Sequence, residues 1–271
     1  MKSTFNLRQH FIPVQPAVKG VENNVSYREI LPDTELQPFV YCYWELKSSQ
    51  SLTTSFNYRV VPDGCIDIFF RLCEPDQSFV MGFSNQYTEY SLGHSFHYIG
   101  IRFLPTVFPR LFGIRADELS NRFETLENVV PDISSFIERH LTPDMCLLEI
   151  KNMLDSNFLH RLSHIAVDDR RVTEAIRIIL ANTGSVSITN DLKTGLSQRQ
   201  MRRLFRFYVG STPKMFSKVV RFQYILRETP SFQQSRKNKL FYDAGYYDQA
   251  HFINEFKTLF GLPPGRAFKR N

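Results

Sequence analysis

Leu196-Ser-Gln-Arg-Gln-Met-Arg-Arg-Leu-Phe-Arg206 is a segment with two helical faces of opposite character. Ser197 is a good N-cap, and Gly210 is a good helix terminator, so the segment predicts a helix from Gln198 to Val209. Side chains at the spacing i, i+3, i+4 and i+7 share one face of such a helix. The apolar face at this spacing consists of Met201, Leu204, Phe205 and Tyr208.

A second face of the same helix carries arginines at the same spacing. Aligned arginines repel each other unless an anion lies against them, and the guanidinium group binds phosphate or the O6/N7 edge of guanine with two parallel hydrogen bonds. The alternative is a solvated face paired with local acids, but the helix contains no acidic residue. We therefore predict a DNA-recognition helix whose contacts come from Gln198, Arg199, Arg202, Arg203 and Arg206.

The segment is repeated 51 residues further along the chain. Residues 197–213 align with 248–264, and identical residues occupy the first helical position, a core position, the terminating glycine and a following proline. These are the positions at which a repeated supersecondary unit must agree. The second helix, capped by Asp248, presents Gln and Asn, which pair with adenine, and a small Ala that admits a thymine methyl. Its predicted DNA contacts are Gln249, Ala250, His251, Asn254 and Lys257, with a surface role for His251 as the alternative.

Each recognition helix needs a supporting helix in front of it to form a helix-turn-helix. A short helix over Ile188–Lys193 is expected before the first one. The predicted boundaries are 186–210 for the first module, 213–228 for a linker helix and 236–261 for the second module. A linker helix of this length spans about 22 Å at 1.5 Å per residue.

Charge separates the chain into two parts. Residues 168–271 contain 19 Lys and Arg against 8 Asp and Glu, whereas residues 1–167 contain 14 against 19. A basic C-terminal part joined to a mildly acidic remainder indicates a polyanion-binding domain and a separate domain for another task. For a chain of 271 residues, we predict two domains, at 1–165 and 168–271.

The N-terminal part reads as β-rich from residue 25 to 105, with short aromatic and β-branched runs separated by turns such as Pro62-Asp63-Gly64 and Glu74-Pro75-Asp76. Helical spacing follows over 107–112, 134–140 and 143–160. The predicted fold class is α+β, with two domains. The first is a β-rich domain with C-terminal helices, whose strands form a small barrel or sandwich and could be cupin-like. The second is an all-α domain with two helix-turn-helix modules. Predicted strands cover 39–46, 56–61, 65–71, 79–83 and 95–103.

Signatures of catalysis and metal binding are missing from the sequence. There is no CxxC, HExxH, phosphate-binding glycine loop or GxSxG motif. His94 and His97 would point to opposite faces of a strand, and Asp63 and Asp67 read as a turn residue and a strand residue. We expect no catalytic residue, no cofactor and no metal site. The three N-terminal cysteines, Cys42, Cys65 and Cys73, read as buried and inert rather than as a redox switch. Four aromatic residues could line an effector pocket, but the sequence favours a core role for them: Tyr41, Tyr43, Trp44 and Phe69.

The location expected from the sequence is the cytoplasm. No run approaches 18 apolar residues, the first 25 residues lack an apolar signal core, and four irregularly spaced cysteines suit a reducing compartment.

The C-terminal segments resemble the AraC/XylS family of bacterial transcription regulators over roughly residues 170–270. The resemblance is carried by residues 196–206, Gly210-Ser-Thr-Pro-Lys214, Arg221-Phe-Gln223, Gly245–Ile253 and 256–264. It implies base and phosphate contacts at Arg199, Arg202 and Arg203 and at residues 249–251 and 254. The chain departs from the family pattern where a small Ala usually supports each recognition helix. The N-terminal half is similar to a β-rich domain of unassigned function, through residues 60–68, 99–105 and 112–119.

The residues and the resemblance together predict a transcription regulator that reads two successive major grooves under control of its N-terminal domain. Double-stranded DNA is the expected partner. The family implies RNA polymerase, a small-molecule effector and a second copy of the chain as further candidates. We expect no membrane partner. Two alternatives remain: an architectural protein with little sequence preference, and an enzyme-like β-barrel with a DNA-tethering tail. The effector, the operator and the sign of regulation do not follow from the sequence.

Overall fold

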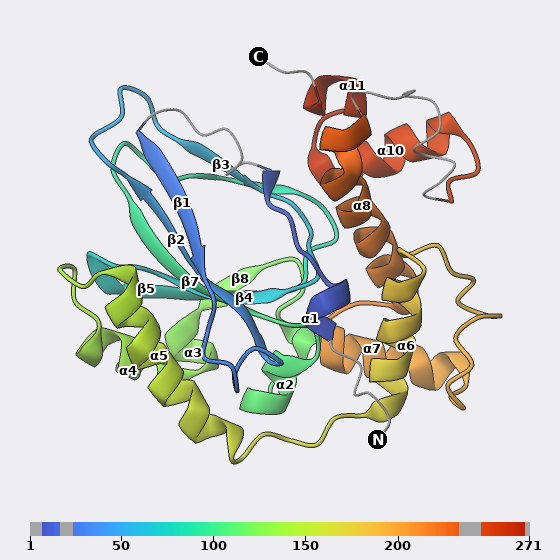
Figure 1. Ribbon diagram of the computed structural model, residues 1–271, viewed down its shortest axis with the longest axis horizontal. Helices are drawn as coiled ribbons and strands as arrows, with labels where there is room; N and C mark the ends of the chain where they lie inside the picture. The colour runs from blue at the N-terminus through green and yellow to red at the C-terminus, as the bar shows by residue number, and fades with distance from the viewer. Residues whose placement is uncertain (1–6, 17–23, 233–244, 269–271) are drawn as a thin grey trace.

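The computed structural model describes residues 7–16, 24–232 and 245–268. A β-rich N-terminal part carries helices on one side, and a helical C-terminal part packs beside it (Figure 1). The strands are β1 (Val25–Ile30), β2 (Val40–Ser48), β3 (Asn57–Val60), β4 (Ile66–Arg71), β5 (Glu74–Met81), β6 (Thr88–Ser91), β7 (His97–Phe103) and β8 (Phe123–Thr125).

Two sheets make up the β-rich part. The larger has six strands in the order β1-β2-β7-β4-β5-β8, and β3 pairs with β6 in a separate two-stranded sheet. Every pairing in them is antiparallel. The predicted β-rich fold is confirmed in the form of an open sandwich; the strands of the described residues do not close into a barrel, so the cupin-like form was wrong.

The six-stranded sheet is buried on both faces. Alternate residues of the central strands, such as Ile68 and Ile101, are fully buried in the main core. The opposite face lies under the two-stranded sheet and carries the second buried cluster, which includes Trp44 and Tyr58. A Cβ on Gly100 would lie 2.0 Å from the Trp44 ring, so glycine is required there for the indole to lie flat on the sheet.

Helices cover the main-core face of the sheet. They are α2 (Val107–Phe112), the short 3-10 helix η2 (Ala116–Glu118), α3 (Leu126–Val129), α4 (Pro131–His140) and α5 (Leu147–Leu162). The three helices predicted here are confirmed with small shifts of their ends. The predicted turn at residues 74–76 was wrong: the chain turns at Leu72-Cys73, and β5 begins at Glu74. Pro75 is tolerated because β8 pairs only with Phe79–Met81, which leaves the first half of β5 at an edge.

The C-terminal part contains α6 (Arg170–Ala181), α7 (Gln198–Val209), α8 (Pro213–Phe232), α10 (Gln249–Phe260) and α11 (Pro264–Ala267). The predicted linker helix is α8, which continues about one turn beyond the predicted end. It runs between α7 and α10 (Figure 1). Within the described residues, no helix has the length and apolar character needed to cross a membrane.

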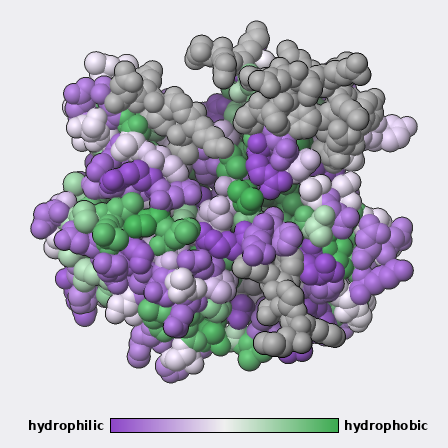
Figure 2. Space-filling view, viewed as in Figure 1, coloured by the Kyte–Doolittle hydropathy of each residue, from purple (hydrophilic) through white to green (hydrophobic). Residues whose placement is uncertain are grey.

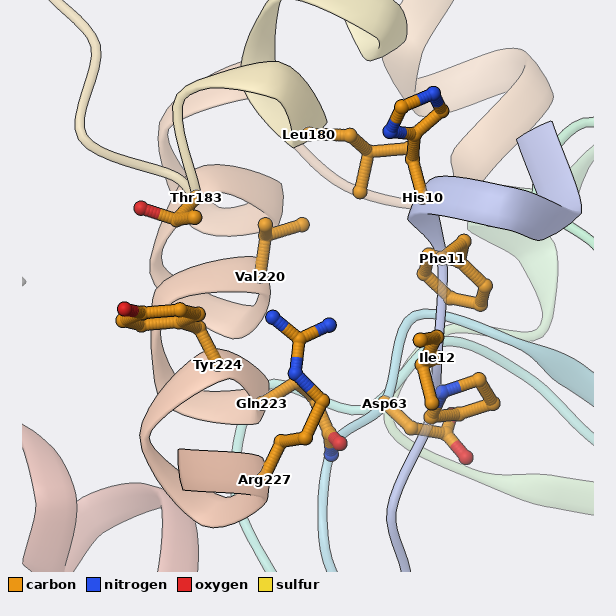
Figure 3. Close-up of a pocket in the computed structure, with 11 residues that line it drawn as sticks. His10, Phe11, Ile12, Asp63, Leu180, Thr183, Val220, Gln223, Tyr224 and Arg227 are labelled. Atoms are coloured by element: carbon orange, nitrogen blue, oxygen red, sulfur yellow. The ribbon is translucent and has the colours of Figure 1, made fainter. Parts of the chain in front are cut away.

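One buried polar side chain joins the two parts. Gln223, on α8, accepts a hydrogen bond from the Val14 amide at 2.7 Å and donates to the carbonyls of Val14 and Pro62, at 3.3 and 2.7 Å. Phe216, about two turns earlier on α8, faces Gly64 in the β3–β4 loop. The main core is therefore continuous from the sheet to α8. Beside this junction lies a small cavity of about 40 Å³ between residues 10–13 and α8 (Figure 3).

Replacing Gln223 with leucine removes three hydrogen bonds and leaves the buried Val14 amide without its partner. We expect Gln223→Leu to lower the free energy of unfolding by about 2 kcal/mol, because an unsatisfied buried polar group costs about 1–3 kcal/mol. Urea denaturation measures this change. The control Lys214→Ala, at an exposed position of the same helix, should stay within about 0.5 kcal/mol of wild type. Equal losses for the two variants would contradict the assigned role of Gln223.

The two histidines considered as metal ligands have separate partners. His94 Nδ1 lies 2.9 Å from the Leu52 carbonyl, and His97 Nε2 lies 2.9 Å from Glu45 Oε1. Among the described residues, no group of three potential ligands is arranged to hold a metal ion.

The four cysteines are free and divide into two pairs by burial. Cys42 and Cys65 are buried as predicted, and burial raises the pKa of both thiols. Cys73 and Cys146 are exposed, so the prediction of a buried thiol was wrong for Cys73. Cys73 lies in the turn before β5, and Cys146 precedes the first residue of α5. Turns and helix starts at the surface leave a side chain in solvent.

Glu45 makes the stability of the β-rich part depend on pH. Burial alone would raise the pKa of Glu45, but hydrogen bonds from His97 and Arg28 outweigh burial and lower the pKa from 4.5 to about 2. A carboxylate with a lowered pKa in the folded state stabilises the protein above its unfolded pKa, and this stabilisation is lost as the pH falls through the folded value. Denaturation at several pH values between about 3 and 6 should show wild type losing stability below the unfolded pKa, and Glu45→Gln showing a flatter profile. Parallel profiles would contradict this assignment.

Candidate nucleic-acid interface

The first predicted recognition helix has the predicted ends. The α7 helix covers Gln198–Val209, Ser197 caps it by accepting from the Gln200 amide, and the Gln200 side chain accepts a hydrogen bond from the Ser197 amide. Gly210 ends the helix in the left-handed region, at φ 88°. Both ends are therefore fixed by local interactions that the sequence predicts.

The two faces of α7 separate as predicted. Met201, Phe205 and Val209 are buried, while Leu204 and Tyr208 are half-buried. All five residues predicted to contact DNA are exposed: Gln198, Arg199, Arg202, Arg203 and Arg206.

The arginines at the outer face of α7 are free to bind an anion. Arg199, Arg202 and Arg203 form no ion pair within 4.0 Å with any residue that the structure describes. Arg206 is partly engaged with the β-rich part: hydrogen bonds from Arg115 lower the pKa of Asp117, and the positive charge of Arg206 adds to that effect. The candidate anion-binding surface of α7 is therefore centred on its first two turns.

The segment that supports α7 differs from the prediction. Residues 188–191 form a single turn, and the expected short helix over Ile188–Lys193 is not present. The Ser187 carbonyl accepts from the Asn190 and Asp191 amides, and the Asp191 carboxylate accepts from the Ser187 amide at 2.7 Å. This side-chain bond competes with helix continuation. Leu192 then leaves the turn and is buried in the main core.

The second predicted recognition helix also has the predicted ends. The α10 helix covers Gln249–Phe260; Asp248 accepts from the His251 amide at 2.7 Å, and Gly261 ends the helix at φ 89°. The predicted contacts on α10 are exposed: Gln249, Ala250, His251, Asn254 and Lys257. The supporting helix of this module was expected between residue 236 and Gly245. Residues 236–244 lie outside the described residues.

The repeat identified at an offset of 51 residues is confirmed as a structural repeat. Both helices have 12 residues, both begin after a capping side chain, and both end at a left-handed glycine. Phe205 and Phe256 occupy the same core position and are fully buried. Pro213 and Pro264 begin the helices that follow, α8 and α11. The C-terminal part therefore contains two similar exposed helices on one framework. On the right of the view, where α6 and α7 lie in Figure 1, the visible surface is mainly hydrophilic (Figure 2).

Two segments of the chain match known families. Residues 192–270 match a helix-turn-helix domain family, and residues 28–125 match a domain family of unknown function. The matched helix-turn-helix segment contains α7, α8 and α10, with all ten predicted contact residues. This segment is an AraC-type helix-turn-helix domain. The chain is accordingly a DNA-binding transcription regulator.

Comparison with solved structures finds ToxT from Vibrio cholerae. An apo form of ToxT with a single substitution is 12% identical, covers 83% of this chain and 96% of its own, and has a TM-score of 0.44. ToxT bound to (E)-4-(8-methylnaphthalen-1-yl)but-3-enoic acid is 11% identical, covering 80% and 98%, with a TM-score of 0.42. At these scores the similarity carries no argument about this chain. A search of curated proteins finds no match.

A buried carboxylate that sequence reasoning missed holds α10 in place. Glu255 is buried, accepts from the Tyr246 hydroxyl at 2.7 Å and forms an ion pair with Lys218 of α8 at 2.8 Å. His251 Nε2 lies 3.7 Å from the same carboxylate. An acidic residue on a predicted DNA-binding helix would weaken phosphate attraction from an outer face, but this carboxylate points inward and ties α10 to α8. Its position at i+3 from Phe252, on the core side of the helix, was the available signal.

Glu255→Gln removes the charge that pairs with Lys218 and keeps the side-chain shape. We expect α10 to lose part of its fixed position on α8. On the hypothesis that each candidate recognition helix reads one half-site, DNase protection should weaken several-fold at the α10 half-site and be retained at the α7 half-site. Lys218→Met should have the same effect, because it breaks the same ion pair. Equal weakening of both half-sites would contradict a local role for the pair.

Proposed function

We propose that the chain binds specific DNA sites by placing α7 and α10 in two successive major grooves. The observation that carries the proposal is the matched pair of capped, 12-residue helices with exposed Arg, Gln and Asn side chains on one framework. An α-helix fits the major groove, and these side chains are the ones that pair with guanine and adenine edges. No chemical reaction is assigned to the chain; its output is binding free energy.

The linker helix has the length that this binding mode needs. With 20 residues, α8 is about 30 Å long at 1.5 Å per residue. Successive major grooves on one side of DNA lie about 34 Å apart. The buried Phe216 and Phe222 of α8 contact Phe205 of α7 and Phe256 of α10. A single rigid element therefore supports both recognition helices.

The N-terminal part is proposed as the regulatory domain, with boundaries at 1–165 and 168–271. Its support is the acidic charge balance, the family match of residues 28–125 that excludes the helix-turn-helix segment, and the junction at Gln223. Dimerisation through this domain, contact with RNA polymerase and action in the cytoplasm belong to the same proposal.

The proposal is tested by selecting genomic fragments with the full-length protein at physiological salt and sequencing the bound fraction. We expect a recurring site with two half-elements about one helical turn apart. Enrichment no better than input, with tight binding to any DNA, would instead support an architectural protein with little sequence preference.

Substitution of single arginines separates base contacts from phosphate contacts. Arg202→Ala or Arg203→Ala should cost about 1–3 kcal/mol of binding to the selected site if the side chain reads a base, with little change for unrelated DNA. A phosphate contact would instead weaken all sequences alike and lower the slope of log K against log salt by about one. Fluorescence anisotropy at several salt concentrations measures both quantities. Arg122→Ala, at an exposed position beside β8, is the control, and an equal loss in this variant would contradict the assigned interface.

A further inference from the structure

The β-rich part contains a cavity of about 250 Å³ between its two sheets. Its walls come from both layers: the six-stranded sheet provides the floor, and β3 and β6 provide the opposite side. Ligand pockets usually span about 300–1,000 Å³, so this cavity suits a molecule smaller than a typical drug. Seven aromatic rings line it: Trp44, Tyr58, Phe69, Phe79, Tyr90, Tyr98 and Phe123.

The floor of the cavity is shaped by Gly100. Because this residue has no side chain, the Trp44 indole lies across β7 and stacks on the Phe69 ring at a centroid distance of 6.4 Å. Phe69 in turn contacts Phe79 at 5.5 Å. Three neighbouring rings on one side of the sheet, inclined to one another by 29° and 33°, form an apolar surface of ring faces. A flat apolar molecule can stack against such a surface.

The polar end of the cavity is lined by one carboxylate and one guanidinium, and two further carboxylates lie beside that guanidinium, outside the cavity lining. Asp67 and Arg102 line it, and Arg102 Nη2 lies 2.9 Å from Asp67 Oδ2. The same guanidinium lies 3.5 Å from Asp63 and 3.9 Å from Glu29. Three carboxyl groups therefore surround a single guanidinium. Asp67 also accepts from Arg102 Nε at 3.2 Å and from the Trp44 indole N–H at 3.0 Å. With these three N–H donors, a carboxylate with about four acceptor sites has capacity for one more.

We propose that this cavity binds a small amine carried on a flat apolar body, with its ammonium group at Asp67 and its body between Trp44, Phe69 and the two-stranded sheet. The excess of carboxyl groups favours a cation over an anion. The ring faces favour it as well, since aromatic π-systems attract cations. Burial raises the pKa of Asp67, against the lowering by Arg102. A bound cation would counter this rise by favouring the ionised carboxylate.

The cavity is connected to the DNA-binding domain through a chain of buried polar contacts. Arg102 reaches Asp63 in the β3–β4 loop, and Asp63 accepts from Gln15 at 2.9 Å. Gln15 also exchanges hydrogen bonds with Val61, and the adjacent Val14 and Pro62 bind Gln223 of α8. A cation at Asp67 would compete with Arg102 for the carboxylate and so act on the Asp63 loop. This regulatory step rests on the proposed function, whereas ligand binding itself does not.

Trp44 is the only tryptophan in the chain, so its fluorescence reports on the cavity directly. The probes are 2-phenylethylamine, 2-phenylethanol and phenylacetate, which share one apolar body and differ in charge. Titration of the full-length protein near neutral pH, with selective excitation of the indole, should give a saturable change for the amine. We expect the amine to bind at least about tenfold more tightly than phenylacetate, with the alcohol between them. No saturable change for any probe, or preference for phenylacetate, would overturn the proposal.

Variants locate the bound probe. Val60→Phe places a ring inside the cavity and should abolish the fluorescence response. Asn57→Phe, at an exposed position of the same strand, is the matched control and should retain it. Asp67→Asn should remove the preference for the amine; if this variant fails to fold, the order of the three probes in wild type still decides the charge requirement. A response that persists in folded Val60→Phe would place the probe elsewhere and overturn the proposal.

DNA binding is measured in the same protein with and without saturating amine. We expect the affinity for the selected site to change at least about threefold, and Gln223→Leu to reduce that change. DNA binding that is specific but unaffected by bound amine would overturn the regulatory step alone. Absence of specific DNA binding, with a normal fluorescence response, would overturn the proposed function and leave the binding site standing.

Discussion

The position of α8 constrains the rest of the molecule. One end of this helix packs on α7, its far side packs on α10, and its remaining face is held to the β-rich part by Gln223. The glutamine is buried, and its amide satisfies both the donor and the acceptor of Val14. Such a bond pattern has one geometry, because an amide that shifts along the helix would leave several buried groups unpaired. The orientation of both candidate recognition helices relative to the sheet therefore depends on Gln223 together with direct contacts, since α7 packs on α2 and η2 and the Phe260 ring of α10 lies under Arg59.

Charge is divided between the inner and outer sides of the C-terminal helices. Acidic groups near these helices are used for internal contacts: Asp248 caps α10, Glu255 pairs with Lys218, and Asp117 lies near Arg206. On the outer surface of α7, Arg199, Arg202 and Arg203 have no ion-pair partner among the described residues. In the proposed complex, DNA phosphates would relieve the mutual repulsion of these cations, and binding would then weaken as the salt concentration rises.

Sequence alone predicted what local interactions determine. The ends of α7 and α10 were predicted to the residue because Ser197, Asp248, Gly210 and Gly261 fix them within a few positions of the chain. The candidate contact residues followed from the same periodicity. The turn at 188–191 was missed because a side-chain hydrogen bond to Asp191 replaces helix there, and periodicity does not report such competition.

Long-range packing was beyond the reach of the sequence. The short strands β1, β6 and β8 were not assigned individually; β6 and β8 pair with β3 and β5, which are not their neighbours in the sequence. The Ile-Gly-Ile-Arg run in β7 held the one clear signal, a glycine and a charged residue inside an apolar strand. In the structure, Gly100 makes room for Trp44 and Arg102 pairs with Asp67, and both contacts join strands that lie far apart in the sequence. A glycine or a charge inside an otherwise apolar strand therefore indicates a specific partner across the sheet. Because Gly100 and Arg102 shape the same cavity, two departures from the apolar strand pattern converge on a site that only the assembled sheets create.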